Sequence, residues 1–157
     1  MLQLTKRTEY GLIALVHMVD RRGEPVSVRE LAERYPVPRR LLAEVLKDLG
    51  RSALVESHRG ATGGYTLARS PDAITLGDVV GALEGAPNLI SCEVPALLRQ
   101  APSCEVKPTC PIRSPIQRVH ERLLDLLERT TLRSLADGPD ATRPPLPPAE
   151  LATPTQT

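Results

Sequence analysis

The sequence of 157 residues has no phenylalanine, no tryptophan and only three tyrosines. Proteins that bind RNA or single-stranded DNA stack bases on aromatic side chains, so this shortage argues against both classes. No apolar run approaches the roughly 20 residues that span a bilayer. Residues 1–11 also lack the apolar region of a signal peptide. We therefore expect a cytoplasmic protein with no membrane partner.

Sequence motifs of catalysis are missing as well. The chain has no glycine-rich phosphate loop, no nucleophile elbow and no acid–base pair at helical spacing. We therefore expect no enzymatic activity and no small-molecule substrate. Residues 1–70 carry twelve Lys and Arg against eight Asp and Glu, whereas residues 71–157 carry eight against eleven. A basic first half is compatible with a polyanionic partner, and double-stranded DNA is the one that remains open.

Apolar periodicity and turn residues predict a mainly α fold with a small β-hairpin. Thr5 and Thr8 are the candidate N-caps of the first helix. Ser27 and Glu30 form a capping box for the second, and the turn YPVP at residues 35–38 separates that helix from the next. Glycines between residues 60 and 64 supply the hairpin turn. Helices are expected at residues 5–22, from 27 to the turn at 35–38, from near Pro38 onward, and at 74–85 and 114–136, and strands at 53–59 and 64–69.

The helix expected at residues 114–136 is predicted to pair with another helix. Ser114 and Pro115 supply an N-cap and a first-turn proline. A stripe with alternating spacings of three and four follows, which is typical of a coiled coil. Its residues are Ile116, Val119, Leu123, Leu126 and Thr130. Such a helix is too short to be stable alone, so we expect a partner.

This order of elements predicts a winged helix-turn-helix domain with a long C-terminal dimerisation helix. The DNA-binding domain is expected at residues 1–84 and the dimerisation helix at 114–136. A cysteine-containing sensor loop at 85–113 joins them, and a tail rich in Pro, Thr and Ala, expected to be disordered, occupies 137–157.

The helix that begins near Pro38 can enter a DNA major groove about 12 Å wide. Taken alone, its first arginines are as compatible with a solvated helix start, and the hairpin with a surface turn. Their combination in this order favours DNA. The predicted DNA-contacting residues are Ser27, Arg39, Arg40, Lys47, His58 and Arg59.

The stretch LTKRTEYGLIAL, and above all RGATGGYTLAR followed by ITLGDVV, resembles the Rrf-two family of bacterial repressors, which includes the IscR and NsrR types. The resemblance covers about residues 1–136. It implies a homodimeric winged-helix repressor whose long C-terminal helices cross to form the dimer. It also implies that the cysteine loop holds an iron–sulfur cluster, of the 2Fe–2S or 4Fe–4S type, which tunes the affinity for DNA.

The three cysteines of the chain, Cys92, Cys104 and Cys110, lie in one proline-rich stretch. An odd number of thiols in a reducing compartment is more typical of metal or redox chemistry than of a disulfide framework. Iron–sulfur clusters are held mainly by cysteine thiolates, so three cysteines leave one ligand to be supplied. The resemblance to NsrR-type members implies that this ligand is Glu9 of the partner subunit. Arg113 stands where IscR-type members carry a histidine.

Several alternatives stay open at this point. The cysteines could bind structural Zn²⁺, although the closely spaced ligand pairs of zinc sites are missing. They could form a metal-free thiol switch in which Cys104 and Cys110 pair on oxidation, or they could be inert. His17 and His120 are second choices as cluster ligands. An accessory protein that acts through its coiled-coil helix is a further class. We favour a DNA-binding repressor that senses iron, redox state or nitric oxide through a cluster.

Overall fold

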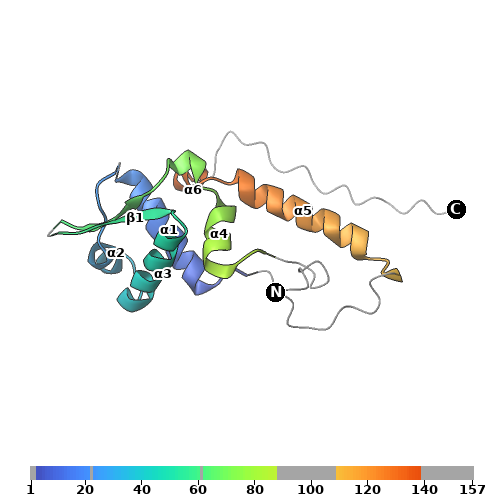
Figure 1. Ribbon diagram of the computed structural model, residues 1–157, viewed down its shortest axis with the longest axis horizontal. Coiled ribbons are helices and arrows are strands. Elements are labelled where there is room, and N and C mark those ends of the chain that lie inside the picture. Colours follow the sequence, from blue (N-terminus) through green and yellow to red (C-terminus); the bar gives the residue numbers. More distant parts are fainter. Residues whose placement is uncertain (1–2, 22, 61, 88–108, 139–157) are drawn as a thin grey trace.

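The computed structural model describes residues 3–21, 23–60, 62–87 and 109–138. Helices α1 to α4, a β-hairpin and α6 gather into one body, from which α5 extends (Figure 1). This arrangement confirms the predicted mainly α fold with a small hairpin and a C-terminal helix. The elements are α1 (Lys6–Asp20), α2 (Val28–Arg34), α3 (Arg39–Arg51), β1 (Val55–His58), β2 (Gly64–Leu67), the 3₁₀ turn η1 (Pro71–Ala73), α4 (Leu76–Glu84), α5 (Arg113–Arg129) and α6 (Leu132–Ala136).

Side-chain caps set where several helices begin. The hydroxyl of Thr5 accepts a hydrogen bond from the backbone N–H of Thr8, so Thr5 is the N-cap of α1 and Thr8 lies inside the helix. Ser27 caps α2 in the same way, accepting from the N–H of Glu30 at 3.0 Å. At α4 the Thr75 hydroxyl accepts from the N–H of Asp78, whose carboxylate accepts from the N–H of Thr75. Each cap satisfies N–H groups that have no partner within the helix.

The core forms around α1, which packs against α3, α4, α6 and β2. This explains why the helix is apolar on nearly every side, since a helix surrounded by others has no face to give to water. Its Ala14 and Leu15 are fully buried, and Met18 and Val19 nearly so. The largest fully buried side chains of the molecule are Leu15, Leu31, Leu46, Leu49, Leu54, Ile74, Leu132, Val26, Val45, Val79 and Thr8.

The hairpin is fixed to the helix-turn-helix by backbone hydrogen bonds. Strand β1 pairs antiparallel with β2, with Val55 opposite Leu67 and His58 opposite Gly64. Val26, which precedes α2, exchanges two 2.9 Å hydrogen bonds with Tyr65 of β2. A Cβ at Gly64 would lie 2.5 Å from the Val26 carbonyl oxygen, so only glycine allows this approach. The wing therefore has a set position relative to α2 and α3.

The C-terminal segment differs from the single helix expected at residues 114–136. Helix α5 begins at Arg113, so Ser114 lies inside it and Ile112 is the N-cap. The helix ends at Arg129, and a separate helix α6 starts after Thr131. The break has a tertiary cause: Leu76 N–H donates to Thr130 O at 2.7 Å, and Leu132 N–H donates to Ile74 O at 2.9 Å. These bonds hold the backbone at 130–131 extended, and α6 folds back onto α1.

Among the described residues, no helix has the length and apolar character needed to cross a membrane.

Candidate DNA interface and sensor residues

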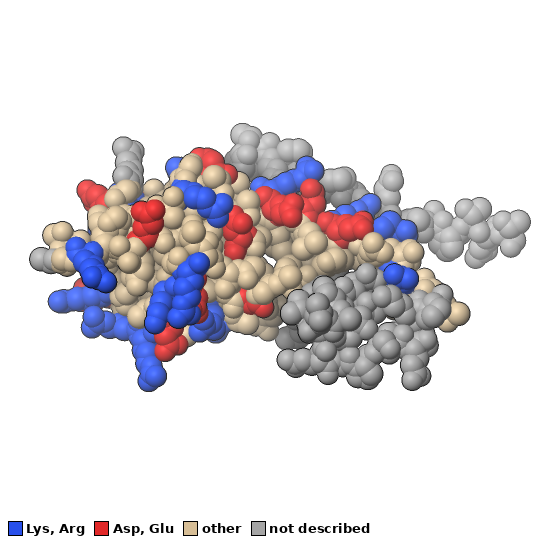
Figure 2. All heavy atoms as spheres, viewed as in Figure 1, with Lys and Arg blue, Asp and Glu red and all other residues tan. Residues whose placement is uncertain are grey.

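Helix α3 presents one apolar face to the core and one basic face to solvent. Leu42, Val45, Leu46 and Leu49 are buried, as the sequence predicts, and Leu41 is half-buried. The candidate DNA contacts Arg39, Arg40 and Lys47 are all exposed on the other side. Lysine and arginine side chains gather over the end of the molecule that holds α2, α3 and the hairpin (Figure 2). The structure thus brings the predicted helix contacts together on one surface.

A groove of about 590 Å³ separates α3 from the hairpin. Lys47 and Arg51 of α3 line one wall, and Ser57 and Tyr65 of the two strands line the other. Arg51 was not among the residues singled out from the sequence. The sequence could have predicted it, because Arg51 follows Lys47 by four residues and so lies on the same side of the helix. The groove therefore carries two basic side chains on its α3 side.

The remaining predicted contacts have different surroundings. Ser27 is half-buried, and its oxygen already accepts the capping hydrogen bond of α2, which leaves the hydroxyl hydrogen for an outside acceptor. His58 is exposed on the wing, where its Nε2 lies 2.9 Å from the hydroxyl of Thr66. Arg59 is exposed at the hairpin turn, directly before Gly60. His58 and Arg59 thus lie on the wing, and Ser27 lies at the start of α2.

His17 has a structural role that the sequence did not reveal. Its Nδ1 lies 3.2 Å from the Tyr35 hydroxyl and its Nε2 lies 3.2 Å from a carboxylate oxygen of Glu30. Arg21 bonds the same oxygen of Glu30 at 2.8 Å. The carboxylate expected to complete the capping box of α2 thus pairs with two side chains of α1. His17 ties both ends of α2 to α1, and neither ring nitrogen is free to bind a metal.

Two of the four candidate cluster ligands, Cys110 and Glu9, lie within the described residues. Cys92 and Cys104 lie outside the described residues. Cys110 has a free, half-exposed thiol shortly before α5. Glu9 lies in the first turn of α1, where its carboxylate pairs with Lys6 at 2.5 Å. Within the described part of the chain, no three potential ligands lie close enough to hold a metal ion. His120, the other second choice, has a buried Nδ1 without a hydrogen-bond partner there.

The first turn of α1 is bonded to the end of α4. Hydrogen bonds from the Thr8 side chain and the Thr5 backbone hold the pKa of Glu84 below its usual range. The Thr5 N–H lies 2.8 Å from the Glu84 carboxylate. Glu84 is the last residue of α4, shortly before the cysteine stretch begins. The turn that carries Glu9 is therefore anchored beside the start of that stretch.

Helix α5 and its N-cap residue expose a row of large apolar side chains. Ile112, Val119 and Leu126 are 60%, 52% and 48% exposed and follow one another every seven residues. Ile116 and Leu123, which are half-buried, lie between them at spacings of four and three. This spacing is typical of a coiled-coil seam, in which apolar residues repeat every 3.5 positions on average. No residue of α5 is fully buried within the chain.

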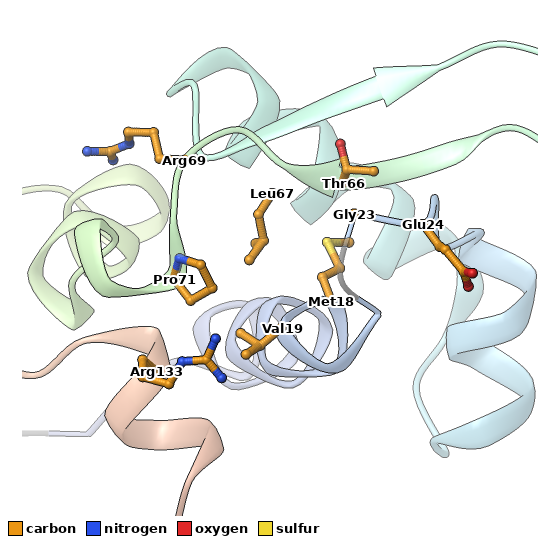
Figure 3. A pocket seen from close by; sticks show the side chains of 9 residues that line it. All are labelled: Met18, Val19, Gly23, Glu24, Thr66, Leu67, Arg69, Pro71 and Arg133. Atoms are coloured by element: carbon orange, nitrogen blue, oxygen red, sulfur yellow. The ribbon is translucent and has the colours of Figure 1, made fainter.

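A pocket of about 240 Å³ lies between the end of α1, β2, η1 and α6 (Figure 3). Its floor is apolar, with Met18, Val19 and Leu67 facing the space. Arg69 at its edge is bonded to Asp78 and to the Ala73 carbonyl. None of the residues predicted to bind DNA or a cluster lines this pocket, and we assign it no function.

Helix α3 has a basic face, follows α2 after a short turn, and is followed by the hairpin of β1 and β2. This order of elements defines the class of winged helix-turn-helix transcriptional regulators. The family model Rrf2, described as an iron-dependent transcriptional regulator, matches residues 4–138. The chain therefore belongs to the Rrf2 family of transcriptional regulators, as the sequence resemblance predicts.

Similar proteins fall within the same group of regulators. The chain is 27% identical over 143 residues to the HTH-type transcriptional regulator NsrR of Bacillus licheniformis, which covers 90% of this chain and 97% of the relative. The structure of CymR, the global cysteine regulator of B. subtilis, is 30% identical, with a TM-score of 0.68 over 89% of this chain and 100% of that one. The structure of T. potens IscR is 27% identical, with a TM-score of 0.65 over 91% and 93%.

Proposed function

We propose that this protein is a homodimeric, DNA-binding repressor whose affinity for its operator is set by a sensor built on its three cysteines. The observation that carries the DNA-binding part is the exposed basic face of α3 beside the wing. Phosphate contacts from Arg39, Lys47 and Arg51 supply affinity, and base contacts from the first turns of α3 supply sequence selection. The second copy of the chain covers the apolar seam of α5.

The sensor is proposed to be an iron–sulfur cluster. Three thiolates and one carboxylate are a donor set that suits such a cluster, and the description of the matching family as iron-dependent supports it. Cys92, Cys104 and Cys110 would hold the cluster, with Glu9 of the partner subunit as the fourth ligand. When bound, the cluster supplies a group whose state changes with iron supply, oxidants or nitric oxide. Within this chain, the carboxylate of Glu9 pairs with the ammonium group of Lys6.

The sensor residues are connected to the DNA-reading helix through α1. Glu9 and Arg7 lie in the same first turn, and Arg7 bonds Asp48 of α3. A change at Glu9 can therefore alter the position of α3. Because two recognition helices must match half-sites about one helical turn apart, a small displacement in each subunit changes the affinity of the dimer for DNA. A metal-free thiol switch acting at the same cysteines is the second candidate.

The DNA-binding part is tested by the variant Arg39→Ala/Arg40→Ala. We expect it to lose at least ten-fold in affinity for a selected DNA duplex, because the lost contacts face the groove. The matched control is Arg118→Ala/Arg129→Ala, which removes two arginines from α5. Fluorescence anisotropy measures affinity, and sedimentation confirms that the dimer is intact. Equal affinities for the two double variants would contradict the proposal.

The sensor part is tested on protein purified without oxygen. Iron and acid-labile sulfide, both present in amounts comparable to the chain, together with visible absorption, are the expected result. The variant Cys92→Ala/Cys104→Ala/Cys110→Ala should contain neither iron nor acid-labile sulfide. If the unaltered protein stays colourless after anaerobic reconstitution but loses DNA affinity on oxidation, the thiol switch replaces the cluster. Equal DNA affinity for both proteins in every state would overturn both sensor models.

A further inference from the structure

Glu44 is an acidic residue on a helix face that is otherwise basic. It lies in the second turn of α3 with its side chain 52% exposed, and its Oε1 is 3.4 Å from Nε of Arg40. Ala43 and Lys47 are exposed on the same side, and the apolar residues of α3 point the other way. The bonded partner of Glu44 is thus a residue of its own helix on the surface proposed to face DNA.

Helix stability does not explain this carboxylate. Exposed ion pairs four residues apart contribute little, and a pair with the cation preceding the carboxylate is the weaker of the two orders. The other carboxylate of α3, Asp48, has a structural explanation because it bonds Arg7 of α1 and Arg51. The folding of the helix therefore does not depend on Glu44.

A carboxylate on a DNA-facing surface is repelled by the phosphates, and this cost must be offset by a contact that only some sequences provide. In the major groove, guanine, adenine and thymine each present an acceptor, whereas cytosine presents only the donor N4 amino group. A carboxylate accepts from that amino group and is repelled by the acceptors of the other bases. The carboxylate of Glu44 is therefore suited to bind the amino group of cytosine.

The contact with Arg40 completes the arrangement. Glu44 faces Nε of the guanidinium, which leaves both Nη groups of Arg40 available. Two parallel N–H donors match the O6 and N7 acceptors of guanine. We propose, on the basis of the DNA-binding function above, that Arg40 and Glu44 read the operator as a pair. Arg40 binds a guanine, and Glu44 binds the amino group of a neighbouring cytosine and sets the preference at that position.

The test is selection of binding sites from a random double-stranded DNA library by the full-length protein and by Glu44→Gln. The unaltered protein should enrich sites with an invariant cytosine. Glutamine bonds N6 and N7 of adenine, so E44Q should shift the preference at that one position from cytosine toward adenine by about ten-fold or more. The matched control is Glu33→Gln on α2, which removes an exposed carboxylate paired with Arg29 four residues away.

The possible results are distinct. A shift at one position for E44Q, with an unchanged site for E33Q, supports the pair. An identical selected site for E44Q and the unaltered protein overturns it, including the case in which E44Q binds every sequence more tightly because repulsion has been removed. If the unaltered protein enriches no site in its cluster-loaded or its metal-free form, the proposed DNA-binding function itself fails and the inference fails with it.

Discussion

Arg7, in the first turn of α1, bonds Asp48 on the recognition helix α3, with Nη2 2.5 Å from Oδ2. The other oxygen of Asp48 accepts from Arg51 at 2.7 Å. One carboxylate thus connects the turn that carries Glu9 with an arginine that lines the groove between α3 and the hairpin. Within one subunit, this contact links the turn of the proposed cluster ligand Glu9 to the proposed DNA-binding helix α3.

Replacing Arg7 by alanine should destabilise the fold. The side chains of Arg7 and Asp48 are 37% and 28% exposed, so we expect a loss of about 0.5–1 kcal/mol in the free energy of unfolding, as for a partly screened ion pair. Chemical denaturation measures this loss. The matched control is Arg118→Ala on α5, which removes an exposed arginine and should change stability by less. An equal effect of both variants would show that the Arg7 contact does not tie α1 to α3.

Replacing Gly64 by alanine should displace the wing. The new Cβ would lie 2.5 Å from the Val26 carbonyl oxygen, so the backbone bonds between Val26 and Tyr65 would have to open. We expect a destabilisation of about 2 kcal/mol, typical of forcing atoms into a packed site. The control is Gly81→Ala in α4, which has open space around it and should stabilise the helix by up to about 1 kcal/mol. Thermal unfolding of both variants measures the difference, and a neutral G64A would contradict the close approach.

The link between Glu84 and α1 should depend on pH. The pKa of Glu84 is lowered from its usual 4.5 by hydrogen bonds from Thr8 and Thr5, so the folded state favours the ionised form. The stabilisation is therefore present above about pH 4.5 and is lost as pH falls through the lowered pKa. Glu84→Gln should be less stable than the unaltered protein at pH 7, with the difference shrinking toward pH 3. In a Thr8→Val background the pH-dependent difference should be smaller, and an unchanged difference would contradict the contact.

The seam on α5 should control association of the chain. Val119→Glu/Leu126→Glu places charges on two side chains that are 52% and 48% exposed in the single chain. If a second copy covers them, the variant should be monomeric at micromolar concentration, because an unpaired charge is costly to bury. Analytical ultracentrifugation measures this. Arg118→Glu, on the same helix but outside the seam, should remain dimeric. A dimeric double variant would place the interface elsewhere.

Local patterns in the sequence predicted most of the DNA-binding half. The caps at Thr5 and Ser27, the buried stripe of α3 and the glycine-rich hairpin all depend on residues within a few positions of each other. Such signals are readable without knowledge of the rest of the chain. The basic face of α3 followed from the same periodicity, and Arg51 could have been added to it.

Long-range contacts explain what the sequence did not predict. The break between α5 and α6 arises from backbone bonds between residues 130–132 and 74–76, more than fifty positions away. The Glu30 carboxylate pairs with His17 and Arg21 of α1 because tertiary packing brings those helices together. The ligand role of Glu9 and of the cysteines depends on a second subunit and on residues outside the described part of the chain, so it stays a prediction.

The attachment of α5 to the body has a mechanical consequence. Its 17 residues extend about 25 Å from the Thr130 junction, where backbone bonds to residues 74–76 form a pivot. The far end of this lever, near Cys110, lies away from the body (Figure 1). A tilt of about 5° at the pivot moves that end by about 2 Å over this length. In the proposed dimer, a displacement applied near Cys110 would therefore reach the DNA-binding domain of each subunit as a small rotation.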